Sequence, residues 1–243
     1  MIILKFFRCL LAFTFICCLS FNTIQAQELH ADLYVIGSNQ SQSQGKWHMK
    51  SQRIGNKLFP YHVIFTNTDG VKTTEEIITF KENLFHSYTC IRHNIGETIT
   101  VTMAADHIEY KRLFENTETI KKRELATNFL AGPLIVPYIQ KHINDLKKGN
   151  VHNIEYAAIS HLRTIAFELK IEKELSSADR LVFKFNPKNF LFNKFVDPIY
   201  FYLSPSGDIL YEIVGRTAAV TRDNDTIIAL DSQYIFKPMI YTR

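Results

Sequence analysis

The sequence predicts a mainly β protein of the α+β class. We expect a curved antiparallel sheet, in the form of a half-barrel or β-roll, with one main amphipathic helix near 134–148. Three observations lead to this prediction. Apolar and polar residues alternate at period two over much of the chain, which is typical of strands with one covered face. Turn-forming clusters separate these stretches, and a single segment has apolar residues at helical spacing.

Residues 1–26 have the three parts of a secretory signal peptide. They begin with the basic residues Lys5 and Arg8, continue with an apolar run and end in a polar stretch closed by the small residue Ala26. Because the apolar run is short for a membrane span, we expect cleavage after Ala26 and no transmembrane segment afterwards. Residues 27–243 then form a single exported β-rich domain, and we expect a bacterial periplasmic location.

Only one of the four cysteines, Cys90, lies outside the signal peptide. An intramolecular disulfide is therefore excluded in the mature chain. A lone cysteine among β-branched and aromatic neighbours is typical of a small buried hydrophobe, so we expect a buried, non-catalytic thiol. Lipidation at Cys17 or Cys18 needs a small preceding residue, which neither has, so we expect no lipid anchor.

Several segments show the alternation of a strand with one covered face. Turn-forming residues such as those at 68–70, 94–96 and 204–208 lie between segments of this kind. The turn at 204–208 joins two good strand candidates, so 198–216 is the clearest predicted hairpin. The apolar positions of the four clearest strands are Ile99, Val101 and Met103; Ile165, Phe167, Leu169 and Ile171; Leu181, Phe183 and Phe185; and Ile199, Phe201 and Leu203.

The predicted helix has recognisable limits. Pro133 can occupy its first turn, where the missing N–H costs nothing, and Gly149 can cap its end. Apolar and aromatic residues recur at helical spacing along one face. These are Ile135, Tyr138, Ile139, His142, Ile143 and Leu146.

Composition and motifs exclude several classes of protein. The formal net charge of +4 is too small to indicate a nucleic-acid-binding protein. Histidine and cysteine spacings fit no zinc motif, and no nucleophile elbow or glycine-rich phosphate loop is present. Ser160 and His161 are adjacent, which is not the spatial pairing that a catalytic triad needs. We therefore predict no catalytic residue, no metal ligands and no cofactor, and hence a protein that is not an enzyme.

One pair of carboxylates needs an interpretation. Glu75 and Glu76 lie close to Lys72 in a threonine-rich turn. We interpret this stretch as a solvated loop rather than as a general acid and base.

Aromatic residues are concentrated between 183 and 202, where there are eight, against 13% for the whole chain. A single well-filled core would explain this concentration. Alternatively, part of this surface lines a concave apolar groove that holds an acyl chain, with the helix closing over it. The residues of this predicted groove are Ile135, Ile139, Ile143, Phe190, Phe192, Phe201 and Tyr202.

A set of short markers resembles an uncharacterised family of exported bacterial proteins with a signal peptide and one β-rich domain. The markers are Gly132-Pro133 before the helix, Asp145-Leu146-Lys147-Lys148-Gly149 at its end, Phe183-Lys184-Phe185-Asn186-Pro187, Val196-Asp197-Pro198 and Gly215-Arg216. At the level of the fold, the layout is also similar to the half-barrel of periplasmic lipoprotein carriers. The resemblance transfers no catalytic residue.

Two hypotheses follow for the function. The first is a periplasmic, non-enzymatic protein that binds an apolar or lipidic ligand in its concave sheet. The second is a structural or protein-interaction module of the cell envelope, which has an envelope protein as partner and no small-molecule ligand. A hydrolase with a site assembled from dispersed residues is a more distant third.

Overall fold

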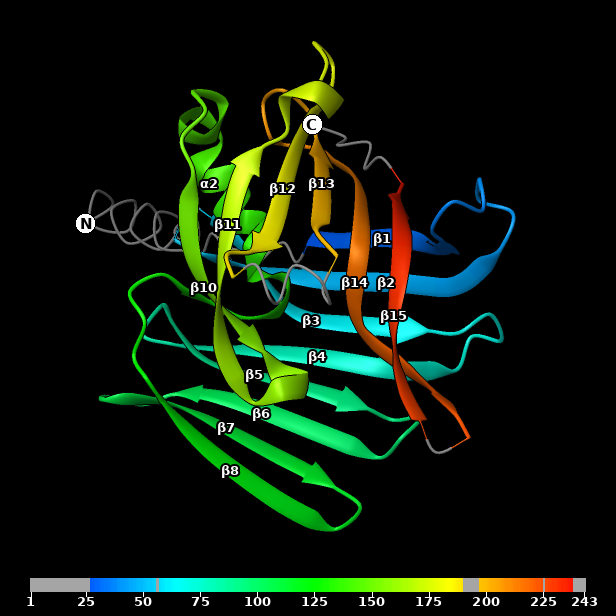
Figure 1. Cartoon of the computed structure of the whole chain (residues 1–243), viewed down its shortest axis with the longest axis vertical. Helices are drawn as coiled ribbons and strands as arrows, with labels where there is room; N and C mark the ends of the chain where they lie inside the picture. Colours follow the sequence, from blue (N-terminus) through cyan, green and yellow to red (C-terminus); the bar gives the residue numbers. More distant parts are fainter. Residues whose placement is uncertain (1–26, 56, 190–196, 225, 238–243) are drawn as a thin grey trace, which may run out of the picture.

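The computed structural model describes residues 27–55, 57–189, 197–224 and 226–237. The strands of the first half of the chain follow one another as hairpins (Figure 1). Their bounds are β1 Gln27–Val35, β2 Ser43–Ile54, β3 Lys57–Thr66, β4 Lys72–Lys81, β5 Leu84–Arg92, β6 Glu97–Met103, β7 His107–Phe114 and β8 Thr117–Glu124.

The second half contains the helix and the remaining strands. The helical segments are the 3-10 turns η1 Gly132–Leu134, η2 Ile159–His161 and η3 Lys173–Leu175, and the α-helix α2 Ile135–Lys147. The strands are β9 Phe129–Leu130, β10 His152–Ala158, β11 Arg163–Ile171, β12 Leu181–Pro187, β13 Ile199–Leu203, β14 Leu210–Asp223 and β15 Thr226–Phe236.

All these strands form one sheet in the described part of the chain. Its order runs from β8 back to β1, and then from β15 back to β9. Neighbouring strands are antiparallel except for the short parallel pair β9 and β10. The first and last strands meet at the centre, where Ala31 of β1 is opposite Phe236 of β15. Since β8 and β9 are the two edges, the sheet is open, and the predicted mainly β fold with one main helix is confirmed.

The sheet curls back over itself and encloses its own core. In Figure 1 the strands β10–β13 run steeply across the direction of β1–β8, and β14 contacts β4 and β5. We call the part from β1 to β8 the first layer and the part from β9 to β15 the second layer. Side chains of both layers meet in two neighbouring apolar clusters, which share Leu130 and Ala218 at their boundary. The covered face of each layer is therefore buried by the other layer.

The helix has the limits expected from the sequence. Pro133 lies in η1, directly before α2, and the N–H of Gly149 donates to the carbonyl of Leu146 with φ at +92°. The side chains of Ile139 and Leu146 are fully buried against the sheet. Within the described residues, no helix combines the length and the apolar character that a membrane crossing would require.

The strands predicted from alternation are also present. The four clearest segments fall in β6, β11, β12 and β13. The expected hairpin consists of β13 and β14, in which Phe201 is opposite Ile213 and the Ser204 N–H donates to the Ile209 carbonyl at 2.9 Å. Across β12 and β13, Phe183 is opposite Phe201. The rings of Phe183, Phe185 and Phe201 therefore lie on the buried face of the second layer.

Candidate functional site

A cavity of about 220 Å³ lies between the two layers, beside η1 and the first turn of α2. Its wall is mostly apolar and aromatic, with contributions from both layers of the sheet. The main aromatic side chains are Trp47 and Phe65 from the first layer, and Phe167, Phe185, Phe201 and Tyr234 from the second. Apolar cavities of about 150 Å³ already take up benzene, so this space can hold a small apolar group.

The structure brings only some residues of the predicted groove to this cavity. Ile135 and Phe201 line it. Ile139 and Ile143 are buried on the same face of α2, in the core cluster beside the cavity rather than in its wall. Phe190 and Phe192 lie outside the described residues.

Tyr202 is placed on the other face of the sheet. Adjacent residues of a strand point to opposite sides, so Tyr202 cannot share the cavity with Phe201. Its half-buried ring lies under the guanidinium of Arg180, whose central carbon is 4.1 Å from the ring centroid. The number of aromatic residues in a segment does not show which face of the sheet each one occupies, whereas the alternation of side chains along the strand does.

The interpretation of Glu75 and Glu76 as a solvated loop is wrong. The turn at 68–70 ends before Lys72, and both acids lie within β4. Because the strand alternates, Glu76 points into the interior with 4% exposure, while Glu75 points outward. A glutamate in a polar stretch gives no local signal of burial, since its partners come from other strands.

Glu76 places an acid in the wall of the cavity. Its Oε1 accepts a hydrogen bond from the Tyr88 hydroxyl at 2.6 Å. Burial raises the pKa of the Glu76 carboxyl from 4.5 to about 7, against the opposing effects of the Tyr88 hydrogen bond and the Arg92 charge. Near neutral pH this group is therefore able either to donate or to accept a hydrogen bond within the cavity.

Two further tyrosines lie near this acid. The Tyr156 hydroxyl donates to the Gly132 carbonyl at 3.0 Å, and Tyr234 lies against the rings of Trp47 and Phe65. Burial, with the Glu76 charge adding to it, raises the pKa of both phenols and of Tyr88. All three hydroxyls therefore stay neutral and act as hydrogen-bonding groups in an otherwise apolar wall.

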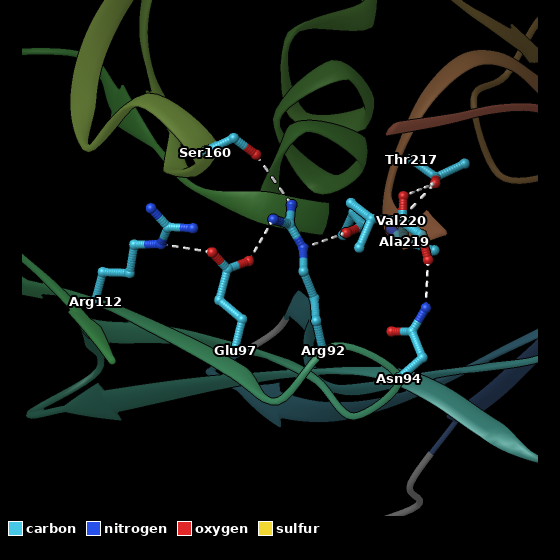
Figure 2. A network of polar contacts seen from close by, with 9 residues as sticks. Arg92, Asn94, Glu97, Arg112, Ser160, Thr217, Ala219 and Val220 are labelled. Carbon is cyan, nitrogen blue, oxygen red and sulfur yellow. Dashed lines mark hydrogen bonds and ion pairs between the residues drawn. The ribbon is translucent and has the colours of Figure 1, made fainter. Parts of the chain in front are cut away.

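Arg92 brings a buried positive charge to the same wall, and Figure 2 shows how it is held. Its Nη1 donates to Glu97 Oε2 at 2.6 Å, Nη2 to Ser160 Oγ at 3.1 Å and Nε to the Ala218 carbonyl at 3.0 Å. The second oxygen of Glu97 accepts from Arg112 Nε at 2.6 Å. Two guanidinium groups thus share one buried carboxylate, and Arg92 connects β5 to η2 and β14.

Cys90 is directly opposite Glu76 on β5 and is fully buried. Burial, followed by the nearby Glu76 charge, raises the pKa of the thiol to about 12. A thiolate is the reactive form of cysteine, so this position does not supply a nucleophile. The predicted buried, unpaired thiol is confirmed.

A second, wider groove also borders the first turn of α2. Its volume is about 920 Å³. Its apolar part includes Met49, Phe59, Phe85 and Phe129. Val136 lines both this groove and the interior cavity, so the two spaces are neighbours at the first turn of α2.

No protein-family model and no curated protein matches the sequence. Solved structures that are similar to it include the following two. One is a β-barrel-like protein of the domain of unknown function DUF1849 from Brucella abortus, with 10% identity, coverage of 87% of this chain and 95% of that chain, and a TM-score of 0.42. The other is a porin-like protein from Bacteroides uniformis, with 8% identity, coverage of 87% and 97%, and a TM-score of 0.25. Similarities of this size carry no inference about function, and the expected likeness to lipoprotein carriers stays a prediction.

Proposed function

We propose that this protein is an exported, non-enzymatic binding protein that holds a small apolar or amphipathic ligand between the layers of its curved sheet. The observation that supports the proposal is the aromatic cavity with Glu76, Tyr88 and Arg92 in one wall. A mostly apolar space with a few converging polar groups is the usual form of a ligand site.

The size and the polar groups restrict the ligand. The cavity, at about 220 Å³, is smaller than the roughly 300–1,000 Å³ of pockets that enclose a drug-sized ligand. A short acyl segment or a single-ring apolar molecule is therefore the class that fits. One hydrogen-bonding group on the ligand, such as a hydroxyl or a carboxyl, would meet the Glu76 carboxyl and the Tyr88 hydroxyl.

The proposal is tested by titration with a neutral apolar fluorophore, N-phenyl-1-naphthylamine, followed by its fluorescence. Ala218 lines the cavity, so Ala218→Leu should fill the space and abolish uptake of the probe. Because the added atoms occupy a void, the variant should melt at or above the temperature of the parent protein. This combination separates a blocked site from a damaged fold.

Two neighbouring residues provide a matched pair of truncations. Phe201→Ala changes the cavity wall and should weaken probe binding, whereas Tyr202→Ala alters the opposite face and should leave probe binding unchanged.

Phe183 is fully buried and is not part of the cavity wall, so Phe183→Ala should cost about 3–5 kcal/mol of unfolding free energy. Phe201→Ala should cost less, because its ring already borders a void. If the probe does not bind and every truncation is equally severe, the interaction-module hypothesis replaces this proposal.

Export is the other part of the proposal and rests on residues 1–26. After cleavage, the protein recovered from the periplasmic fraction should begin at Gln27, and its intact mass should show no lipid. N-terminal sequencing and mass spectrometry measure both. A diacylglycerol group on Cys17 or Cys18 would contradict this expectation and place the protein at a membrane surface.

A further inference from the structure

The strands β1 and β2 carry a group of potential metal ligands on the outer face of the sheet. His30 of β1 is directly opposite His48 of β2, and Glu28 lies two residues before His30 on the same face. The alternate residues of both strands, including Leu33 and Trp47, are buried in the core. The three side chains are therefore on the face opposite to the proposed ligand cavity.

The three side chains converge closely. The two imidazole rings are stacked, with centroids 4.2 Å apart and planes at 7°. Glu28 Oε2 lies 3.2 Å from His48 Nε2 and 3.7 Å from His30 Nε2. One ligand atom from each residue lies within 4.8 Å of the other two, so small side-chain rotations would bring all three to one ion.

Hydrogen bonding within the protein does not account for this arrangement. His48 Nε2 is buried and, among the described residues, makes no hydrogen bond of acceptable geometry, although Glu28 Oε2 is near it. That nitrogen therefore has no hydrogen-bond partner among the described residues, and it lies beside the Glu28 carboxylate and the stacked His30 ring.

A second group of histidines on the same face provides a contrast. His62 and His93 share Glu75, but they approach different oxygens of that carboxylate, Oε1 and Oε2, and the ammonium of Lys72 lies 2.8 Å from Oε2. In the first group, the ammonium of Lys50 is 3.5 Å from Glu28 Oε1, which leaves Oε2 facing the two imidazoles. Both imidazoles of the first group therefore face one carboxylate oxygen, so an ion placed there can meet all three side chains.

We propose that Glu28, His30 and His48 form a binding site for a divalent transition-metal ion of the zinc class. Two imidazole nitrogens with one carboxylate oxygen suit zinc, copper or nickel, and not calcium or magnesium. Three protein ligands leave at least one coordination position for water.

Because of the position of this site, a bound metal ion would stabilise the pairing of β1 with β2. β1 is the strand through which the first layer pairs with the second, because it lies between β2 and β15. An ion held by Glu28, His30 and His48 joins β1 to β2 near the beginning of β1. Since it binds the folded arrangement and not the unfolded chain, the ion should raise the melting temperature.

The test is a calorimetric titration of the protein with Zn²⁺, using protein purified without a histidine tag and stripped of metal by a chelator. We expect one site of highest affinity per chain. His30→Gln and His48→Gln each remove a direct ligand. Each should lower the affinity of that site for Zn²⁺ by at least roughly 10–100-fold, which is the loss expected when only a hydrogen-bonding partner of a ligand is removed. Both variants should also lose the rise in melting temperature on addition of Zn²⁺.

His62→Gln is the matched control, because it removes a histidine beside a carboxylate on the same face and should leave the highest-affinity site intact. Melting of each metal-free variant shows whether it folds, and Glu28→Gln provides a third substitution that preserves side-chain shape. Equal weakening by His62→Gln and His48→Gln would overturn the proposal. So would an unchanged affinity in the variants of Glu28, His30 and His48.

Discussion

Two adjacent glutamates, Glu75 and Glu76, have carboxyl pKa values shifted in opposite directions, because neighbouring residues of a strand point to opposite faces of the sheet. Glu75 faces outward, where hydrogen bonds from Lys72, His62 and His93 lower the pKa of its carboxyl to about 2 against the effect of burial. Glu76 faces the interior, where burial raises the pKa to about 7. The sequence indicated neither direction, because the responsible partners lie on other strands or in the enclosed core.

The raised pKa of Glu76 predicts a pH-dependent stability. Between pH 4.5 and 7 the unfolded chain loses its proton while the folded protein keeps it, so stability falls as the pH rises through this range. The full difference corresponds to about 3 kcal/mol. Glu76→Gln, which carries no charge at any pH, should differ from the parent protein by less than about 1 kcal/mol at pH 5 and be more stable by about 1–3 kcal/mol at pH 8.

Chemical denaturation of both proteins at the two pH values measures this effect. Glu118→Gln is the control, because Glu118 is exposed on β8 and its substitution should change stability equally at both pH values. A Glu76→Gln variant that is no more stable than the parent at pH 8 would show that the interior tolerates the charged carboxylate.

At the scale of elements, local patterns predicted the helix and the clearest hairpin, whereas they assigned the part of β4 around Glu75 and Glu76 to a loop. The helix limits follow from Pro133 and Gly149, and the hairpin of β13 and β14 follows from alternation around a turn. These features depend on neighbours in the sequence, and so they can be predicted without the fold. The turn at Gly132 differs, because its requirement for glycine also comes from distant residues.

Gly132 has φ at +52°, and a Cβ added there would lie 2.4 Å from Tyr88 Cε2 and 3.0 Å from Glu76 Oε1. Gly132→Ala should therefore combine left-handed backbone strain with overpacking and cost about 2–5 kcal/mol. It should also displace Tyr88 and weaken probe binding. Gly70 is the matched control, with φ at +79° and no heavy atom within 4 Å of an added Cβ.

Gly70→Ala should cost only the strain, about 1–2 kcal/mol, and leave the cavity unchanged. Thermal and chemical unfolding of the two variants, with the fluorophore titration, separate the contributions. Equal effects of the two substitutions would mean that Tyr88 and Glu76 move aside without cost.

At the scale of the whole molecule, the curling of the sheet depends on contacts that no local pattern reveals. Arg92 donates to Ser160 and to Ala218, which are 68 and 126 residues away in sequence. Asn94 donates to the Val220 carbonyl at 2.6 Å, again across the two layers. The candidate site lies between those layers, so its residues could be predicted only where a single strand or helix determined the face, as for Ile135 and Phe201.

The buried carboxylate of Glu97 holds the guanidinium of Arg92, which connects the two layers. It is 2% exposed and holds Arg92 and Arg112 through its two oxygens. Glu97→Gln leaves the buried Arg92 charge without its carboxylate, and loss of one partner in such a pair costs about 3–5 kcal/mol. Glu118→Gln, which breaks the exposed pair with Lys111, should cost less than about 1 kcal/mol.

Because Arg92 connects β5 to β14, Glu97→Gln should also speed hydrogen exchange at the amides of β14 near Ala218. The amides of β1 and β2 should change less. If the two substitutions cost the same unfolding free energy and exchange in β14 is unchanged, apolar packing alone holds the two layers together.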